Sequence, residues 1–282
     1  MITDFFVIIS DMFSFTFIVR AFVVGILVSL CASLLGISLV MKRFSMIGTG
    51  LSNVSFGSVA IAMVMNAAPL LVSIPVVIIA AFLLLRLSEN SKIQGDAAIA
   101  LVSTSSLAIG VIVISMTTGM NTDVCNLMFG SILAMSRNDV YLSIILSVMV
   151  LILFILFYHK LFAITFDESF AKAGGVKTGA YNMLIALLTA LTIVLGMRMM
   201  GALLISSLII FPALTSMRIF KSFKTVTICS SIIAVFCFFT GIVMSYIHAT
   251  PAGASVIIMN ISVFILFWAV SIILQRKKLQ EV

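Results

Sequence analysis

The stretch YHKLFAITFDESFAKAGGVKTG, residues Tyr158 to Gly179, is a polar interruption a little past the middle of a chain that is otherwise largely apolar. Its central part, Asp167 to Ala173, has the composition of a short exposed helix. Acidic residues near the start and a lysine near the end suit the dipole of such a helix, and Gly174-Gly175 is a typical stop signal. The pattern predicts a cytoplasmic loop with a short helix, which is either a functional contact or a simple solvated connector.

Composition places the chain in a membrane. Of its 282 residues, 63% are hydrophobic and 9% are charged, whereas a soluble domain averages about 45–50% apolar and about 25% charged residues. The apolar runs are roughly 20 residues long, which is the length of a membrane-spanning helix and about twice that of a barrel strand. We therefore expect an all-α, polytopic transmembrane bundle. The first residues lack a basic segment and a small-residue cleavage site, so we expect no cleavable signal peptide.

The net charge of +7 reflects membrane topology. Lys and Arg gather at the ends of the apolar runs, as expected where basic residues mark the cytoplasmic side of a membrane. The charge therefore indicates contact with membrane lipid, and we expect no nucleic-acid partner. The four cysteines show no CxxC spacing, which argues against a disulfide framework and a zinc site.

The apolar pattern predicts nine spans, at residues 15–41, 48–65, 70–87, 97–117, 140–157, 180–196, 202–217, 226–247 and 254–274. Eight spans are the alternative, with one short segment re-entrant, and residues 127–135 are too short to cross alone. Residues 197–201, MRMMG, are expected to form a tight outer turn. With the N-terminus outside, the basic groups at 42–43, 86–92, 160–177, 218–224 and 276–278 all fall inside, while Asp123, Arg198 and His248 fall outside.

The whole chain, residues 1–282, is expected to form one transmembrane domain, with 158–179 as its longest loop. No stretch is long enough for a soluble catalytic domain, and the sequence has neither a Walker phosphate-binding motif nor HExxH. We therefore expect no enzyme activity and no bound cofactor.

Several segments carry more specific patterns. Residues 36–53 have the sequence GISLVMKRFSMIGTGLSN, residues 129–140 FGSILAMSRNDV, and residues 166–176 FDESFAKAGGV. In this order along the chain, they resemble three motifs of the membrane permeases of zinc and manganese ABC importers: G-x-x-L-V-x-R-R-x-S-x-x-G-D-x-L-S-H, F-G-S-I-L-A-V-S-x-x-D-V, and the coupling helix F-D-x-E-x-A-x-A-x-G-V. Residues 201–213, which begin GALL and end FPA, and residues 250–254, TPAGA, extend the resemblance over nearly the whole chain.

The resemblance implies a homodimeric permease in the cytoplasmic (inner) membrane of a prokaryote, of the same broad type as the vitamin B12 importer. Two cytoplasmic ATPase subunits would bind beneath it and use the ATP, and an extracytoplasmic metal-binding protein would dock outside. The central loop would then contact the ATPase and transmit its closure as a rigid-body shift. The implied coupling residues are Asp167, Glu168, Ser169, Phe170, Ala171, Lys172 and Gly174, with Phe170 and the alanines as an apolar foot and the charged residues as a polar rim.

The departures from the pattern concern the cargo. In the family, an Asp and a His four residues apart line the translocation path, where they are suitable transient ligands for zinc or manganese. Here the matching residues are the neutral Thr49 and Asn53. The family's Asp before Thr-Pro-x-Gly-Ala is replaced by Ala249, and His248 is the nearest donor. The resemblance thus implies path residues Thr49, Asn53 and His248, with no certain metal ligand.

Two interpretations of these departures remain open. The metal crosses with few protein ligands, with His248, Asp123 and methionine sulfurs as candidates, or the cargo is not a divalent metal. A separate alternative is that the chain is a degenerate or non-metal-transporting permease partner that acts as a structural half of a heteromeric transporter. Methionines 197, 199 and 200 are either soft-metal ligands or packing residues. Pro212 is expected to kink the seventh span beside the path, where a kink allows gating.

Overall fold

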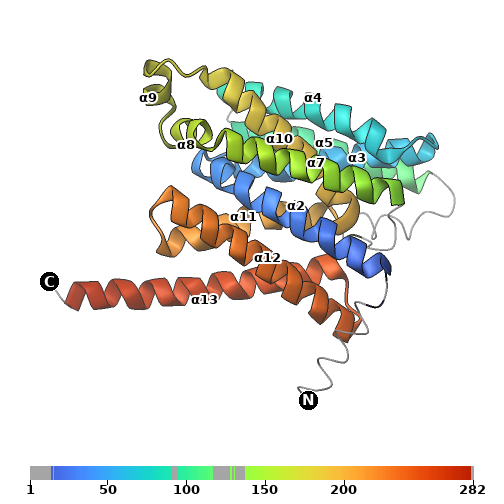
Figure 1. The fold of residues 1–282 in the computed structure, drawn as a ribbon. Coiled ribbons are helices and arrows are strands. Elements are labelled where there is room, and N and C mark those ends of the chain that lie inside the picture. Colours follow the sequence, from blue (N-terminus) through green and yellow to red (C-terminus); the bar gives the residue numbers. More distant parts are fainter. Residues whose placement is uncertain are drawn as a thin grey trace.

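A computed structural model describes residues 14, 16–90, 95–116, 128, 130 and 137–280. Every regular element in these ranges is a helix (Figure 1). The long helices are α2 (Thr16–Met41), α3 (Ser45–Val64), α4 (Pro69–Asn90), α5 (Gly95–Ser115), α7 (Arg137–Leu156), α10 (Thr178–Met200), α11 (Ala202–Ile219), α12 (Phe223–His248) and α13 (Ala252–Gln280). These nine, within the described ranges, are long and apolar enough to cross a membrane, which confirms the predicted all-α bundle and the larger of the two counts.

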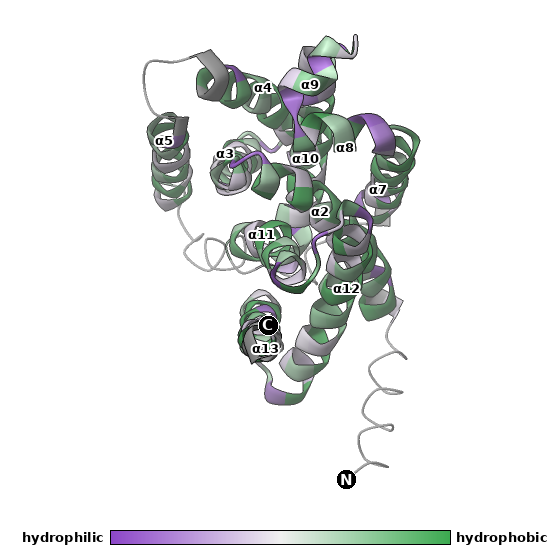
Figure 2. Cartoon of the chain, turned by 90° about the vertical axis from the view of Figure 1, so that its left-hand side faces the viewer, coloured by the Kyte–Doolittle hydropathy of each residue, from purple (hydrophilic) through white to green (hydrophobic). Residues whose placement is uncertain are grey.

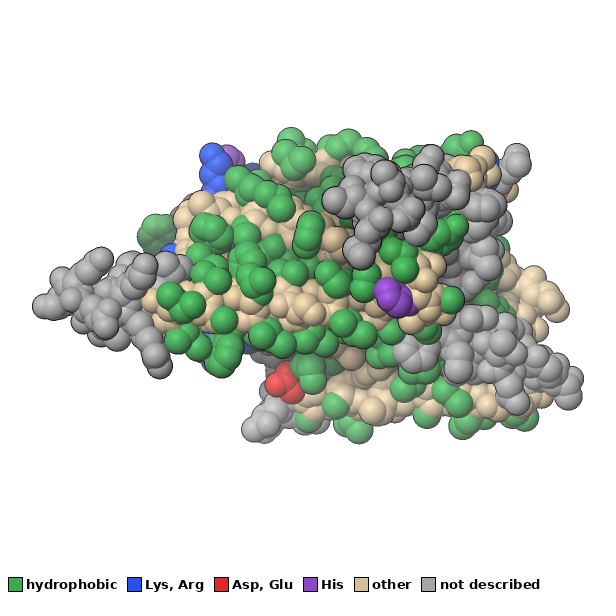
Figure 3. Space-filling model, turned by 90° about the horizontal axis from the view of Figure 1, so that it is seen from below, with side chains coloured by type: hydrophobic (Ala, Val, Ile, Leu, Met, Phe, Trp, Pro, Cys, Tyr) green, Lys and Arg blue, Asp and Glu red, His purple; other side chains and the backbone are tan. Residues whose placement is uncertain are grey.

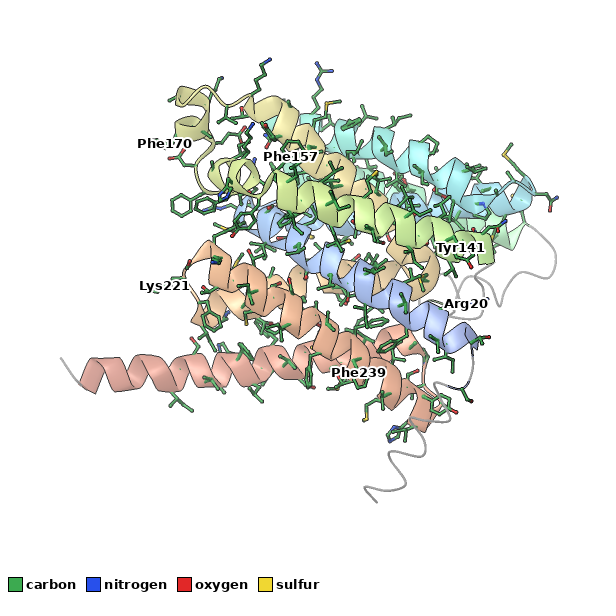
Figure 4. The ribbon with its side chains drawn as sticks, viewed as in Figure 1. Arg20, Tyr141, Phe157, Phe170, Lys221 and Phe239 are labelled. Carbon is green, nitrogen blue, oxygen red and sulfur yellow. The ribbon has the colours of Figure 1, made fainter. Side chains whose placement is uncertain are left out.

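The bundle has two distinct ends. Figure 4 shows Phe170 and Lys221 at one end, which we call the α9 end after its short helix, and Arg20 and Tyr141 at the other, the Arg20 end. Figure 2 shows hydrophobic residues along most of each long helix. The grouping of Lys221 with the central loop agrees with the predicted topology, in which both lie in the cytoplasm.

Helices α10, α3 and α2 form the buried centre of the bundle, whereas α13, α5 and α7 lie at its margin. The outer side of α13 exposes large apolar side chains, among them Ile258, Leu266 and Trp268. Figure 3 shows a face that is covered mainly by hydrophobic side chains. Such a surface is stable only against lipid or another apolar surface.

Small residues allow the closest helix contacts. A Cβ atom on Gly36 of α2 would lie 1.9 Å from the carbonyl oxygen of Ile209 in α11, and one on Gly57 of α3 would lie 2.7 Å from the carbonyl oxygen of Ser106 in α5. Only glycine permits backbones to approach so closely. Helix α3, which is rich in Gly, Ser and Ala, therefore packs inside the bundle with most of its residues buried.

The predicted outer turn at residues 197–201 is wrong. Helix α10 continues to Met200, and the turn is made by Gly201, whose φ of 85° and ψ of 159° suit glycine. Met197, Met199 and Met200 are at most 5% exposed and belong to the hydrophobic core. The segment contains no helix breaker before Gly201, and methionine is a good helix former. These methionines are therefore packing residues, the second of the two alternatives.

The central loop contains two helices, α8 (Tyr158–Phe166) and α9 (Glu168–Ala173). Helix α9 confirms the short helix predicted from the sequence, and it ends at Gly174. Helix α8 was not predicted. It buries Leu161 and Ile164, and Lys160 lies 5.4 Å from the centre of the Tyr181 ring in α10. The loop is therefore packed onto the bundle and is not a free connector.

Candidate functional site

Helix α9 is a six-residue element that projects at the α9 end of the bundle. Its first turn is capped by Asp167, whose Oδ1 accepts a hydrogen bond of 2.9 Å from the Phe170 backbone N–H. Ala171 is buried against the bundle, whereas Phe170 is 76% exposed (Figure 4). An aromatic side chain so exposed on a capped helix is suited to insertion into a groove of a partner protein. Ser169, Lys172 and Gly174 are exposed beside it.

Glu168 is different, because its carboxylate bonds within the chain. Its Oε2 lies 3.1 Å from Nζ of Lys42, and its Oε1 accepts a hydrogen bond of 2.9 Å from Nδ2 of Asn182. Lys42 also donates to Oδ1 of Asn182. The Lys42 side chain is 8% exposed, whereas that of Glu168 is 46% exposed. We call Lys42, Glu168 and Asn182 the Lys42 triad; it joins α9 to the ends of α2 and α10.

The sequence predicts that Glu168 belongs to a polar rim facing the ATPase, and it gives no functional role to Lys42 or Asn182. Lys42 is a charge at a span end, which the topology alone explains. It lies 126 residues from Glu168 and 140 from Asn182, so no local spacing signals the contact. The docking role of α9 stays a prediction, and the structure adds that one of its acids is committed to the permease.

Thr49 and Asn53 lie one helical turn apart near the start of α3, and both are partly buried. Nδ2 of Asn53 donates a 2.7 Å hydrogen bond to Oγ of Ser103 in α5. Between them, the Ser52 hydroxyl lies 3.0 Å from the Ser206 hydroxyl of α11. A seam of uncharged hydrogen bonds thus joins α3 to two neighbouring helices. Such bonds contribute about 0.6–2 kcal/mol each within a membrane.

The three predicted path residues do not form one site. Thr49 and Asn53 lie in the first part of α3, which begins just after α2 ends at the α9 end of the bundle. Helix α12 begins at the same end, beside Lys221, and His248 is its last residue, so His248 lies toward the Arg20 end. His248 is exposed, and its Nδ1 lies 3.1 Å from the Met244 carbonyl oxygen of the preceding turn. The metal roles predicted for His248 and Asp123 therefore stay predictions, and Asp123 lies outside the described residues.

Potential metal ligands do not gather elsewhere in the described part of the chain. Those ranges contain no group of three His, Cys, Asp or Glu residues that could hold a metal ion. Pro212 is buried inside α11, which continues as a helix on both sides of it. The gating role of Pro212 stays a prediction.

A second ion pair lies at the Arg20 end. Nη2 of Arg198, in the last turn of α10, lies 3.1 Å from Oδ2 of Asp139, in the first turn of α7. The two side chains are 15% and 19% exposed. The sequence predicts Arg198 in an outer turn and gives Asp139 no partner. The structure instead makes them a contact between two helices.

Comparison with known proteins gives consistent relatives. The chain is 28% identical over 257 residues to the manganese import system permease protein ScaB of Streptococcus gordonii, covering 91% of this chain and 92% of that protein. It is also 28% identical over 252 residues to the high-affinity zinc uptake system membrane protein ZnuB of Haemophilus influenzae, covering 89% and 97%. Among solved structures, PsaBC from Streptococcus pneumoniae in complex with Fab matches with a TM-score of 0.83 at 28% identity, over 95% of each chain.

A second solved structure, an inward-facing putative metal-chelate type ABC transporter, matches with a TM-score of 0.66 at 14% identity and supports the fold alone. The nine apolar helices of the described residues and the membrane permeases among the relatives place the chain in the prokaryotic cytoplasmic membrane as a multi-pass protein. The model of the ABC 3 transport family matches residues 14–271, and the chain belongs to that family.

Proposed function

We propose that this chain is the membrane permease subunit of an ATP-driven importer of a divalent transition metal, manganese or zinc. The observation that carries the proposal is the match to PsaBC over 95% of both chains at a TM-score of 0.83. Relatives named as manganese and zinc permeases, matched over about nine-tenths of this chain, support the same cargo class.

In this proposal, ATP is hydrolysed on a separate cytoplasmic subunit that docks on α9. Phe170 inserts into a groove of the ATPase, and the capped helix moves with it as a rigid body. A second copy of the chain completes the path, and an extracytoplasmic metal-binding protein delivers the cargo to the Arg20 end. The exposed apolar side of α13 faces lipid or the second copy.

In this proposal, the neutral α3 residues Thr49 and Asn53 lie along the path of the cargo. Hydroxyl and amide groups bind a hydrated or otherwise coordinated cation weakly, because they lack the charge and basicity of a carboxylate or an imidazole. Thr49 and Asn53 would therefore let the metal pass with few direct protein ligands. The same neutrality favours the second candidate, a non-translocating structural half that pairs with a more complete permease.

The test is uptake of radioactive manganese or zinc into proteoliposomes that contain the permease with its ATPase and binding protein. ATP-dependent accumulation by a transporter with this chain as its sole permease is expected. Absence of uptake by that complex, with activity restored only when a second permease is co-expressed, would favour the structural-half alternative.

A paired substitution tests the path. Thr49→Asp together with Asn53→His adds two good ligands one turn apart, so metal should be retained more tightly and released more slowly. Thr49→Asn together with Asn53→Gln alters size without adding such ligands and serves as the control. If the cargo is not a metal, the first pair should impair its transport, because it adds an unpaired charge to a neutral path.

A further inference from the structure

Helix α9 has weak covalent restraints at both ends. It is six residues long, it is preceded by Asp167 in an extended conformation, and it is followed by Gly174 and Gly175, of which Gly175 has a φ of 80°. The backbone N–H groups of Gly174, Gly175 and Val176 bond back to residues of α9 itself, so these bonds close the helix and do not tie it to the bundle. A helix held only by such connections would not transmit a force in a defined direction, so its orientation depends on side-chain contacts.

The Lys42 triad supplies these contacts. Each of its three side chains bonds to both of the others: Lys42 to Glu168 at 3.1 Å, Asn182 to Glu168 at 2.9 Å, and Lys42 to Asn182. Lys42 and Asn182 are almost completely buried. The Lys42–Glu168 bond joins a buried ammonium group to a carboxylate that is 46% exposed, and its charges make it stronger than a bond between neutral groups. The first turn of α9 is therefore fixed to two helices of the bundle.

The position of Lys42 gives this attachment a direction. Lys42 directly follows Met41, the last residue of α2, and α3 begins three residues later. The intervening turn is tight: Arg43 has a φ of 61°, and the Phe44 N–H donates a 2.8 Å bond to the Leu39 carbonyl oxygen. A displacement of α9 that pulls on Lys42 therefore moves the start of α3, which carries Thr49 and Asn53. Asn182 transmits the same displacement to α10.

We propose that the Lys42 triad is the contact through which movement of α9 is converted into movement of α3 and α10. Glu168 is then a positioning residue of the permease and not a docking residue for the ATPase. This inference rests on the proposed function, since it requires an ATPase that moves α9. The docking surface is left to Phe170 and its exposed neighbours.

The first experiment measures the coupling ratio, the metal transported per ATP hydrolysed, in proteoliposomes. Glu168→Gln and Lys42→Met each remove one charge of the pair, and each should leave ATPase co-purification intact while lowering the ratio roughly tenfold, the effect expected for one lost charge-assisted contact. Lys177→Met is the matched control, because Lys177 is exposed, lies four residues after Ala173, and contacts the described residues through its backbone carbonyl oxygen, which the substitution keeps. It should keep the wild-type ratio.

The charge swap Lys42→Glu with Glu168→Lys tests whether the ion pair itself is needed for coupling. The amide of Asn182 can donate or accept at either position, so the swapped triad can form again. The coupling ratio of the swap should exceed that of either single variant. A coupling ratio at the wild-type value in both single variants would overturn the inference, and so would loss of ATPase co-purification in Glu168→Gln, since Glu168 would then be a docking residue.

The second experiment needs no cargo. With the four native cysteines replaced, spin labels are placed at Ala173→Cys on α9 and at Lys221→Cys at the same end of the bundle, and their distance distribution is measured in the permease without ATPase. Glu168→Gln and Lys42→Met should broaden the distribution, whereas Lys177→Met should not. Equal widths in all variants would show that the triad does not hold α9.

The two experiments separate the two proposals. If the wild-type complex shows no ATP-driven metal uptake, the proposed function fails, and the spin-label distances still decide whether the triad fixes α9. If the wild type transports metal and Glu168→Gln keeps both its coupling ratio and its narrow distribution, the inference fails and the proposed function stands.

Discussion

Replacement of Gly36 by alanine should weaken the centre of the bundle. Gly36 lies where α2 crosses α11, and an added Cβ would be 1.9 Å from the carbonyl oxygen of Ile209. That oxygen belongs to the backbone of a helix, so it cannot turn away as a side chain can. The two helices would have to separate until the new contact reaches an ordinary distance of at least 3.4 Å, which is a shift of about 1.5 Å in a close-packed core.

The magnitude follows from two opposing terms. Overpacking of a core costs roughly 1–3 kcal/mol, and a backbone obstacle places Gly36→Ala at the upper end of that range. Alanine is a better helix former than glycine by about 1 kcal/mol, which offsets part of the loss. We therefore expect a net loss of about 2 kcal/mol in the free energy of unfolding.

Gly48→Ala is a matched control, because its Cβ would meet the same residue. That Cβ would lie 3.4 Å from Cδ1 and 3.7 Å from Cγ2 of Ile209, which are ordinary contacts with the end of a flexible side chain. Thermal unfolding of the purified permease in detergent, followed by loss of the monodisperse peak in size-exclusion chromatography, compares the variants. Gly36→Ala should unfold several degrees below wild type and Gly48→Ala at or above it. Equal unfolding temperatures for both variants would refute the close approach of α2 and α11.

Three further predictions concern the two ends of the bundle. Asp139→Asn should lower the free energy of unfolding by about 1–3 kcal/mol, between the values for exposed and buried pairs, because Arg198 loses its ionic partner; the same thermal assay measures it, and an unchanged unfolding temperature would count against the pair. Phe170→Asp should abolish co-purification of the ATPase without altering thermal stability, since Phe170 is 76% exposed; retained binding would contradict the docking role of α9. In a cysteine-free background, an impermeant maleimide should label Lys221→Cys only from the cytoplasm and Tyr141→Cys only from outside, and the reverse pattern would overturn the topology.

The sequence predicts the features that depend on local chemistry and on membrane thickness. In the described ranges, nine apolar runs of spanning length are helices, because a helix satisfies every backbone group of such a run in lipid within the run itself. Helix α9 follows from an acidic cap at Asp167 and a stop at Gly174. The sequence does not predict α8, whose buried Leu161 and Ile164 acquire meaning only from the surface they cover. Nor does it predict the Lys42 triad, whose members come from α9, α10 and the turn after α2.

The wrong prediction of a turn at residues 197–201 shows that a charged residue in the sequence does not locate the end of a helix, and α10 shows why. Asn182 near its start and Arg198 near its end both bond to residues outside the helix, and they are sixteen residues apart. At 1.5 Å per residue they are separated by about 24 Å along the helix, close to the thickness of the hydrocarbon layer of about 30 Å. A charge such as Arg198 therefore marks where the apolar layer ends, and the prediction of a turn at 197–201 assumes that the helix ends there too. The end of the apolar layer and the end of the helix are different positions, because an arginine paired with Asp139 can remain helical at the membrane boundary. Only the backbone conformation of Gly201 ends the helix, so that polar residues fix the membrane boundary and glycine fixes the turn.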